Sequence, residues 1–108
     1  MELRFLGSGC AIPYPERVQS GILLKDDPLL FDCGSGVLHN LTRTSINFDD
    51  VGDVLLTHNH LDHVSDLLAL IKADWLVGRE ELNVYGPPGT GDTVDGLFDA
   101  FEYLKDRV

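Results

Sequence analysis

The chain has 108 residues, of which 44% are hydrophobic and 24% charged, a composition typical of globular proteins rather than disordered or fibrous ones. Such a length holds one domain and falls below the roughly 200 residues that large barrel enzymes need. The 18 acidic and 8 basic residues give a formal net charge of -10, which disfavours binding to nucleic-acid backbones and anionic lipid.

The distribution of charged residues and cysteines indicates where the protein works. The acids are mainly aspartate, 13 of 18, which suits either a high-salt environment or simply an acidic surface. Two cysteines, Cys10 and Cys33, are too few for the disulfide framework of a small secreted domain. Charged residues near the N-terminus argue against a signal peptide, and no apolar run approaches the ~20 residues of a membrane span. We expect a cytoplasmic protein without a membrane partner.

The first part of the chain predicts short strands and one helix. Glycine and proline interrupt the apolar runs, and the polar stretch Lys25-Asp26-Asp27-Pro28 separates two of them, which is typical of a β-hairpin. Apolar positions at Val37, Leu38 and Leu41 follow helical spacing. The expected elements are a strand at residues 3–5, hairpin strands at residues 21–24 and 29–31, and a helix within residues 36–44.

The remaining chain alternates strands and helices. The longest helix is expected to bury one apolar stripe, with Asp66, Lys72 and Asp74 on its other faces. That stripe consists of Val64, Leu67, Leu68, Ile71, Trp75 and Leu76. A last amphipathic helix is marked by Val94, Leu97, Phe98, Phe101 and Leu104. The expected strands are a buried one within residues 51–57 and another at residues 82–85. Strands followed by a βαβα alternation predict an α/β fold with a mixed sheet.

The densest chemistry follows the buried strand, where residues 58–63 hold three of the four histidines and one carboxylate. Imidazole and carboxylate are ligands that suit a divalent ion such as Zn²⁺. In an extended segment His58 and His60 point the same way and can share one ion, whereas Asp62 and His63 can face a second. The end of a sheet strand is also where open α/β sheets bind ligands. The alternative interpretation is a solvated polar turn capped by Asp62.

The pattern H-x-H-x-D-H resembles the signature of the metallo-β-lactamase superfamily. Four other segments are most similar to its ribonuclease Z branch, whose members cut the 3′ trailer from precursor tRNA. These segments are residues 5–9, 20–24, 30–34 and 84–89. The resemblance implies that residues 1–108 form the N-terminal half of an αββα sandwich. It further implies two metal ions, usually zinc, bridged by a water or hydroxide that attacks a phosphodiester or other ester.

Carried over by position, the resemblance assigns a role to each residue of the motif. His58 and His60 match ligands of the first metal, and Asp62 and His63 match ligands of the second. Asp62 also matches the group that handles the proton. Asp32 matches a residue that holds the histidine loop by hydrogen bonds, although a simple turn carboxylate is an equal alternative.

The sequence also departs from the family pattern. Asp66 stands where glycine is usual, and Ser35 stands where ribonuclease Z commonly has an acidic residue. The family's remaining ligands come later than the region covered by this chain, and the fourth histidine, His39, precedes the motif and is not expected to bind metal. Each ion therefore has two recognisable ligands, whereas a catalytic zinc usually has three.

Two competing hypotheses remain. Residues 86–93 nearly match the phosphate-binding pattern G-x-x-x-x-G-K-[ST], but Asp92 replaces the lysine, so we expect a rigid turn and no nucleotide site. The other alternative is a non-catalytic, truncated or self-associating module that pairs as a homodimer through an exposed sheet. The favoured hypothesis is a zinc-dependent hydrolase of a phosphodiester or other ester, such as precursor tRNA.

Overall fold

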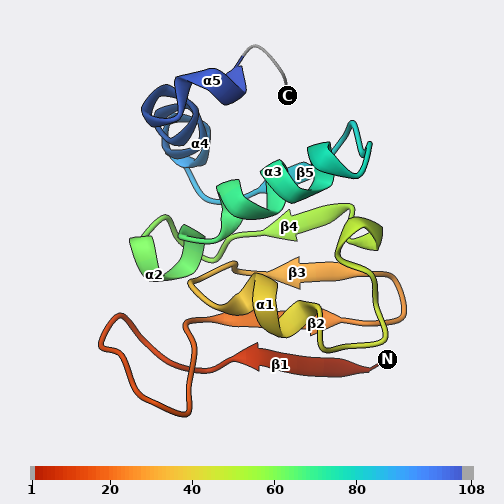
Figure 1. The fold of residues 1–108 in the computed structure, drawn as a ribbon. Helices are drawn as coiled ribbons and strands as arrows, with labels where there is room; N and C mark the ends of the chain where they lie inside the picture. The colour runs from red at the N-terminus through yellow and green to blue at the C-terminus, as the bar shows by residue number, and fades with distance from the viewer. Residues whose placement is uncertain (1, 106–108) are drawn as a thin grey trace.

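The computed structural model describes residues 2–105 as one five-stranded sheet with helices packed against it (Figure 1). The strands are β1 (Leu3–Gly7), β2 (Gly21–Leu24), β3 (Leu29–Phe31), β4 (Asp53–Leu55) and β5 (Asn83–Tyr85). The helices are α1 (Val37–Leu41), the 3₁₀ turn η1 (Phe48–Asp50), α2 (Leu61–Val64), α3 (Leu67–Leu76), α4 (Thr90–Ala100) and α5 (Glu102–Lys105). The mixed α/β fold expected from the sequence is confirmed.

The strands lie in the sheet in the order in which they occur in the chain, β1-β2-β3-β4-β5. The first three are antiparallel, and β3, β4 and β5 run parallel. The hairpin formed by β2 and β3 has the expected bounds, with Leu24 opposite Leu29 across the turn. The parallel strands bring the segments that follow β3, β4 and β5 to the same edge of the sheet, where the histidine motif lies.

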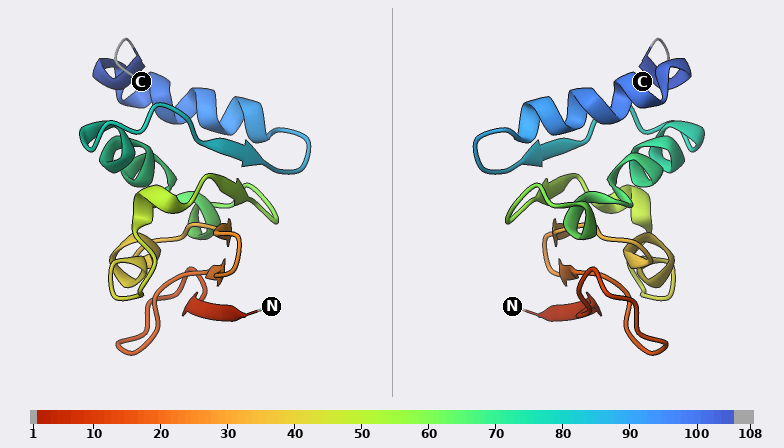
Figure 2. Two further views of the ribbon diagram at one scale, coloured as in Figure 1. Left: turned by 90° about the vertical axis from the view of Figure 1, so that its right-hand side faces the viewer. Right: turned by 90° about the vertical axis from the view of Figure 1, so that its left-hand side faces the viewer.

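Helices cover one face of the sheet. Figure 2 shows α1 and α3 on the same side, where they enclose the core with the inward row of strand residues. In cross-strand register this row is Leu23, Leu30, Val54 and Val84, and it ends on β1 with Arg4, which is exposed. Leu23, Leu30 and Val54 are completely buried in it. Helix α4 lies beyond β5, so that it extends the molecule at that end of the sheet (Figures 1 and 2).

No helix covers the opposite face within residues 2–105 (Figure 2). Its side chains form two rows in cross-strand register, one of Leu3, Leu24, Leu29, Asp53 and Asn83 and one of Phe5, Ile22, Phe31, Leu55 and Tyr85. The second row is apolar across all five strands. Phe5 is 68% exposed, and Leu3 and Tyr85 are also exposed. The sheet thus has one buried face and one open apolar face.

The long helix expected from Val64 to Leu76 is interrupted. Its first turn is the separate α2, and α3 begins again at Leu67 after Ser65 and Asp66. Because α3 packs against η1, its buried face includes Leu70 and Asp74, whereas Leu76 is 65% exposed. The expectations that Leu76 is core and that Asp74 lies on a polar face are therefore wrong. Helical periodicity thus predicted the helix correctly, but the face that the helix buries is rotated about its axis from the predicted one.

The last amphipathic helix is likewise two helices, α4 and α5, with a break at Phe101. Leu104 is buried as expected, but Phe101 is exposed, because its backbone leaves the helical conformation at the break. The described helices include none with the length and apolar character needed to cross a bilayer.

Candidate metal centre

The histidine motif lies at the edge where the parallel strands end. Backbone hydrogen bonds continue past the strands, from Asp32 N–H to the Leu55 carbonyl (2.9 Å) and from Leu56 N–H to the Tyr85 carbonyl (2.7 Å). These bonds fix the segment after β3 beside the segment after β4. Asp32 and Thr57 are therefore neighbours although 25 residues separate them. Sheet register, rather than the motif itself, brings Asp32 to the histidines.

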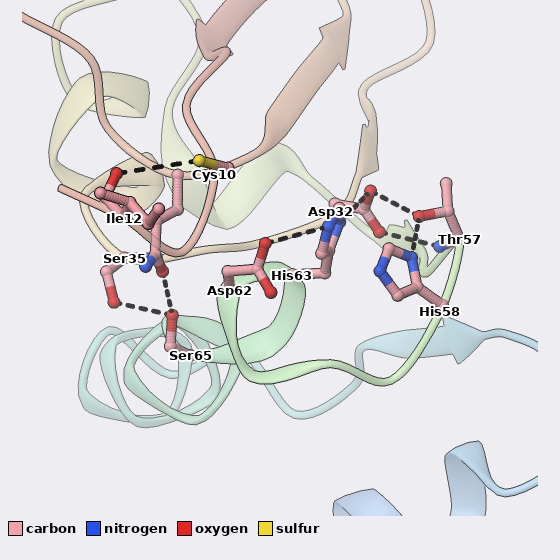
Figure 3. A network of polar contacts seen from close by, with 10 residues as sticks. Cys10, Ile12, Asp32, Ser35, Thr57, His58, Asp62, His63 and Ser65 are labelled. Atoms are coloured by element: carbon pink, nitrogen blue, oxygen red, sulfur yellow. Dashed lines mark hydrogen bonds and ion pairs between the residues drawn. The ribbon is translucent and has the colours of Figure 1, made fainter. Parts of the chain in front are cut away.

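Asp32 lies at the centre of the cluster and is only 3% exposed. Its Oδ1 accepts a hydrogen bond from Thr57 N–H (2.8 Å), and its Oδ2 accepts one from the Thr57 hydroxyl (2.8 Å). The same Oδ2 lies 2.8 Å from Nδ1 of His63 (Figure 3). Its backbone has φ 63, in the left-handed region that aspartate tolerates better than most residues. The structure thus places Asp32 as the residue that holds both ends of the histidine loop.

The hydrogen-bond network assigns the tautomer of two histidines. A carboxylate only accepts, so Nδ1 of His63 carries the proton that it donates to Asp32. The Thr57 hydroxyl gives its proton to Asp32 and therefore accepts from Nδ1 of His58 at 3.0 Å. In its neutral form each of these rings consequently keeps a lone pair on Nε2. This is the nitrogen state required of a histidine that binds metal through Nε2.

His63 and Asp62 face each other across a short gap. Nε2 of His63 lies 3.3 Å from Oδ2 of Asp62 (Figure 3). With the proton on Nδ1, both atoms of this pair are acceptors, so a cation must lie between them, either a second proton on the ring or a metal ion. Two ligands bound tetrahedrally to one zinc at ~2.1 Å lie ~3.4 Å apart. The spacing of this pair therefore fits a shared ion.

The other histidines are arranged more loosely. The ring of His58 lies 3.8 Å from that of His63 and 4.6 Å from that of His60, between centroids. His60 is exposed at the rim, and His39 is exposed on α1. Across residues 2–105, no three or more His, Cys, Asp or Glu side chains converge where one ion could be held. The donor types and the Asp62–His63 pair fit a divalent metal, but they form a partial ligand set.

Cys33 is next to Asp32 but does not behave as a ligand. Its side chain is completely buried in the core. Burial raises the pKa of the thiol, and the carboxylates of Asp66 and Asp32 raise it further, so the sulfur stays protonated. A neutral buried thiol is a poor metal ligand and a poor nucleophile. The structure therefore assigns Cys33 to the core.

The turn at residues 86–93 is fixed to the histidine loop rather than opened towards a phosphate. The Thr90 hydroxyl lies 3.0 Å from Oδ1 of Asn59 and 2.8 Å from the Pro87 carbonyl, and these two acceptors share its single proton. A hollow of about 960 Å³ between β5 and α4 adjoins this turn. Among the described residues it is lined by Glu80, Glu81 and Asp95 but by no lysine or arginine. This charge opposes a nucleotide phosphate.

Several residues that build the centre were not singled out from the sequence. Thr57 transmits the hydrogen bond from His58 to Asp32, and the only signal for it was its place directly before the motif. Gly34 lets the chain pass close to Asp62, since an added Cβ would overlap the Asp62 carbonyl oxygen. Asp66 and Ser35, noted only as departures from a pattern, make hydrogen bonds between the two loops.

Known proteins resemble the chain over nearly its whole length. Ribonuclease Z of Mycobacterium marinum is 36% identical over 94% of the chain and 38% of the relative. Ribonuclease Z of Picosynechococcus sp. is 37% identical over 97% of the chain and 34% of the relative. The chain thus spans about a third of the length of these curated relatives.

Solved structures give the same result for the fold. The human tRNase Z short form superposes with a TM-score of 0.81 and 30% identity, over 94% of this chain and 40% of that one. The metallo-β-lactamase fold protein YhfI of Bacillus subtilis has a TM-score of 0.77 and 29% identity, over 88% and 39% of the two chains. The resemblance to the metallo-β-lactamase superfamily and its ribonuclease Z-like branch is confirmed.

A family model described as Anti-Pycsar protein Apyc1 matches residues 1–94, most of the chain. Together with the sheet topology and the arrangement of the histidine loop, this match shows that the chain belongs to the Anti-Pycsar protein Apyc1 family and has a metallo-β-lactamase fold.

Proposed function

We propose that this chain supplies the N-terminal metal-binding half of a ribonuclease Z-like hydrolase that cleaves a phosphodiester. In this proposal His58 and His60 hold one divalent ion and Asp62 and His63 hold another, with zinc as the expected metal. Asp32 binds no metal and orients the histidines. The proposal extends to this chain what the names of its relatives say of them.

One observation carries the proposal: Nε2 of His63, which is an acceptor when the ring is neutral, lies 3.3 Å from Oδ2 of Asp62. A carboxylate and an imidazole lone pair repel each other in this arrangement unless a cation lies between them. The hydrogen bond to Asp32 maintains that lone pair in the neutral ring, because it fixes the proton on the opposite nitrogen. A solvated polar turn would not need this chain of bonds.

The residues of this chain have distinct tasks in the proposed reaction. A bound divalent metal lowers the pKa of water and stabilises the leaving oxygen of a phosphodiester. A carboxylate oxygen of Asp62 takes up the proton that the attacking water releases. Asp32 keeps His63 in one orientation and stabilises its Nδ1–H. Thr57 does the same for His58 through its hydroxyl oxygen.

The open face of the sheet supports the proposal that the chain is half of an αββα sandwich. Phe5, Phe31 and Leu55 belong to an apolar row that spans five strands. Two sheets that pack face to face bury such rows between them at a separation of about 10 Å. We infer that a second sheet of the complete polypeptide packs on this face and brings the remaining metal ligands.

The substrate is proposed as an RNA or other phosphodiester, and the names of the relatives make precursor tRNA the first one to test. The net charge of -10 opposes binding of such an anion by the surface of this chain. Contacts to the substrate therefore come from the metal ions and from parts of the protein outside residues 1–108. The cytoplasm, where tRNA is processed and thiols stay reduced, is the proposed location.

The test uses the complete gene product that carries residues 1–108. Zinc content after dialysis and hydrolysis of bis(p-nitrophenyl) phosphate and precursor tRNA are measured for wild type, His63→Ala and Asp62→Asn. We expect bound zinc in wild type and at least about a 100-fold loss of rate in both variants. His39→Ala, a histidine variant outside the centre, keeps zinc and activity. A His63→Ala protein that retains both refutes the proposal.

A non-catalytic, self-associating module is the second candidate, and the open apolar face favours it, because a second copy would cover the same rows. Sedimentation and zinc content of the complete gene product distinguish the two. A dimer that Phe5→Glu dissociates, without bound zinc, supports the module, whereas bound zinc supports the hydrolase.

A further inference from the structure

Asp66 connects two segments that carry the candidate metal centre. Its Oδ2 accepts hydrogen bonds from the backbone N–H groups of Gly36 (2.9 Å) and Leu38 (3.1 Å) at the start of α1. The N-cap residue of α1 is Gly36, which has φ 92 and no side chain that could cap the helix. The cap therefore comes from a residue about 30 positions later in the chain. Such a long-range cap makes the position of α1 depend on the segment between α2 and α3.

Backbone hydrogen bonds reinforce the same connection. Asp66 N–H donates to the Cys33 carbonyl (2.9 Å), and Cys33 N–H donates to the His63 carbonyl (2.7 Å). Cys33 follows Asp32, whose carboxylate holds the His63 ring. His63 is thus fixed at its backbone and its side chain by consecutive residues of one loop. Asp66 closes this loop on its far side.

A separate set of side chains ties the other rim of the same junction. The Ser35 hydroxyl donates to the Ser65 hydroxyl (2.7 Å), which in turn donates to Oε1 of Gln19 (3.0 Å). Ser35 N–H also donates to this oxygen (3.0 Å). Figure 3 shows Ser35 and Ser65 side by side next to the Asp62–His63 pair. The two contacts of Ser35 are more exposed than those of Asp66.

Helix α2 is too short to be stable by itself. It has four residues, far fewer than an isolated helix needs to be stable in water. The location of His63 and Asp62 is therefore set by contacts with the rest of the fold. Among the described contacts, those of Asp66 join the end of α2 to both Cys33 and α1.

We propose that Asp66 is a positioning residue for the metal centre, acting through the spacing between the Asp32 loop and α2. The inference rests on the proposed function, because metal binding is the property that this spacing serves. When the Asp66 acceptor is lost, α2 can move away from Asp32. The Asp62–His63 pair then loses the geometry that a shared ion requires.

The first experiment needs no metal. Amide hydrogen exchange of Gly36 and Leu38 is measured by NMR in the complete metal-free protein, for wild type, Asp66→Ala and Asp66→Asn. We expect exchange at both amides to become at least about 10-fold faster in Asp66→Ala, since their acceptor is gone. Asp66→Asn keeps an oxygen in place and retains most of the protection. Unchanged exchange in Asp66→Ala overturns the structural part of the inference.

The second experiment measures zinc affinity by competition with a chelating dye. We expect the dissociation constant to rise by about 10–100-fold in Asp66→Ala and to change little in Asp66→Asn, the effect typical of residues that orient metal ligands. Thr44→Ala is the control, because the Thr44 hydroxyl donates to the Leu41 carbonyl and accepts from Ile46 N–H at the other end of α1. This variant loses stability but keeps its zinc affinity.

The outcomes separate the two proposals. A wild-type protein that binds no zinc refutes the proposed function, while the exchange experiment still decides whether Asp66 holds the loops together. If wild type binds zinc and Asp66→Ala binds it equally tightly, the positioning role is refuted. If Asp66→Ala does not fold, Asp66→Ser replaces it, because its shorter hydroxyl cannot reach both amides, and the same increase in dissociation constant is expected.

Discussion

At the scale of single residues, Asp32 shows how one carboxylate determines the chemistry of its neighbours. Its two oxygens accept from Thr57 and His63, and through Thr57 it also determines the tautomer of His58. Asp32, which lies outside the motif, thus determines where His58 and His63 carry their ring protons. The tautomer depends on an obligate acceptor at this position, because Nδ1 must then carry the proton that it donates.

We predict that Asp32→Asn preserves the shape of the centre but reverses the tautomer of His63. Asparagine tolerates the left-handed backbone, yet its amide nitrogen can donate to Nδ1 and move the ring proton to Nε2. The ¹⁵N shifts of the imidazole ring report this change, and zinc affinity falls by about 10–100-fold. Asp92→Asn, an exposed change on α4, leaves both unaltered. A His63 ring that keeps its proton on Nδ1 in Asp32→Asn contradicts the prediction.

Gly34 provides a second prediction at this scale. An added Cβ would lie 2.6 Å from the Cβ of Gln19 and would overlap the Asp62 carbonyl oxygen. Gly34→Ala therefore lowers the free energy of unfolding by about 1–3 kcal/mol. The matched change Gly96→Ala has open space around it within α4 and raises the same free energy by about 0.5–1 kcal/mol. Urea unfolding of both variants checks the opposite signs, and equal effects would show that Gly34 is not crowded.

Sequence reasoning at this scale found the donors but not their support. Histidines and a carboxylate in six positions form a local pattern that is visible without a structure. The part played by Thr57 depends on the register of β3 against β4, which pairs residues 24 positions apart. That of Asp66 depends on a cap across about 30 residues. Such contacts between distant residues cannot be predicted from the residues around either partner.

At the scale of helices and strands, α3 differs most from expectation. Its Asp74 carboxylate is 3% exposed, and within residues 2–105 neither of its oxygens has a hydrogen-bond partner. Burial raises the pKa of Asp74 to about 6, with the Arg79 guanidinium opposing this rise and Asp49 adding to it. The carboxyl group therefore takes up a proton more readily in the folded protein than in the unfolded chain.

We predict that this group makes the protein less stable as the pH rises from about 4 to about 6. Below pH 3.8 Asp74 is protonated in both states, whereas between the two pKa values only the folded state keeps the proton. The free energy of unfolding falls across this window by up to about 3 kcal/mol, at 1.36 kcal/mol per pKa unit. The difference between the urea-unfolding curves of wild type and Asp74→Asn isolates the effect.

The control for this prediction is Asp92→Asn, which removes an exposed carboxylate from α4. Its stability is expected to follow wild type throughout the same pH range. If the free energy of unfolding of wild type changes with pH between 4 and 6 in the same way as that of Asp74→Asn, Asp74 has an ordinary pKa.

The elements that were predicted well are those that local chemistry determines. The hairpin has the expected bounds because a polar turn with proline separates two apolar runs. The break between α2 and α3 was missed because Ser65 and Asp66 bind Gln19, Cys33 and α1 rather than continuing a helix. Helical periodicity shows which face of a helix is apolar. It does not show which residues from other segments will form hydrogen bonds that interrupt the helix.

At the scale of the whole molecule, helices cover only one face of the sheet within residues 2–105. The helix-covered face has completely buried residues such as Leu23 and Val54, while Phe5 on the other face is 68% exposed. Monomeric proteins rarely leave a contiguous apolar patch of this kind uncovered. The open face and the partial ligand set both support the proposal that additional structure completes the sheet and the metal centre.

The strand order has a consequence for how the protein is made. Each of the strands β2 to β5 pairs with the strand that precedes it in the chain. Because the ribosome makes the chain from its N-terminus, the strand with which each new strand pairs is already present when the new strand emerges. The segments that carry the cluster from Asp32 to Asp66 therefore leave the ribosome before β5 and α4 do.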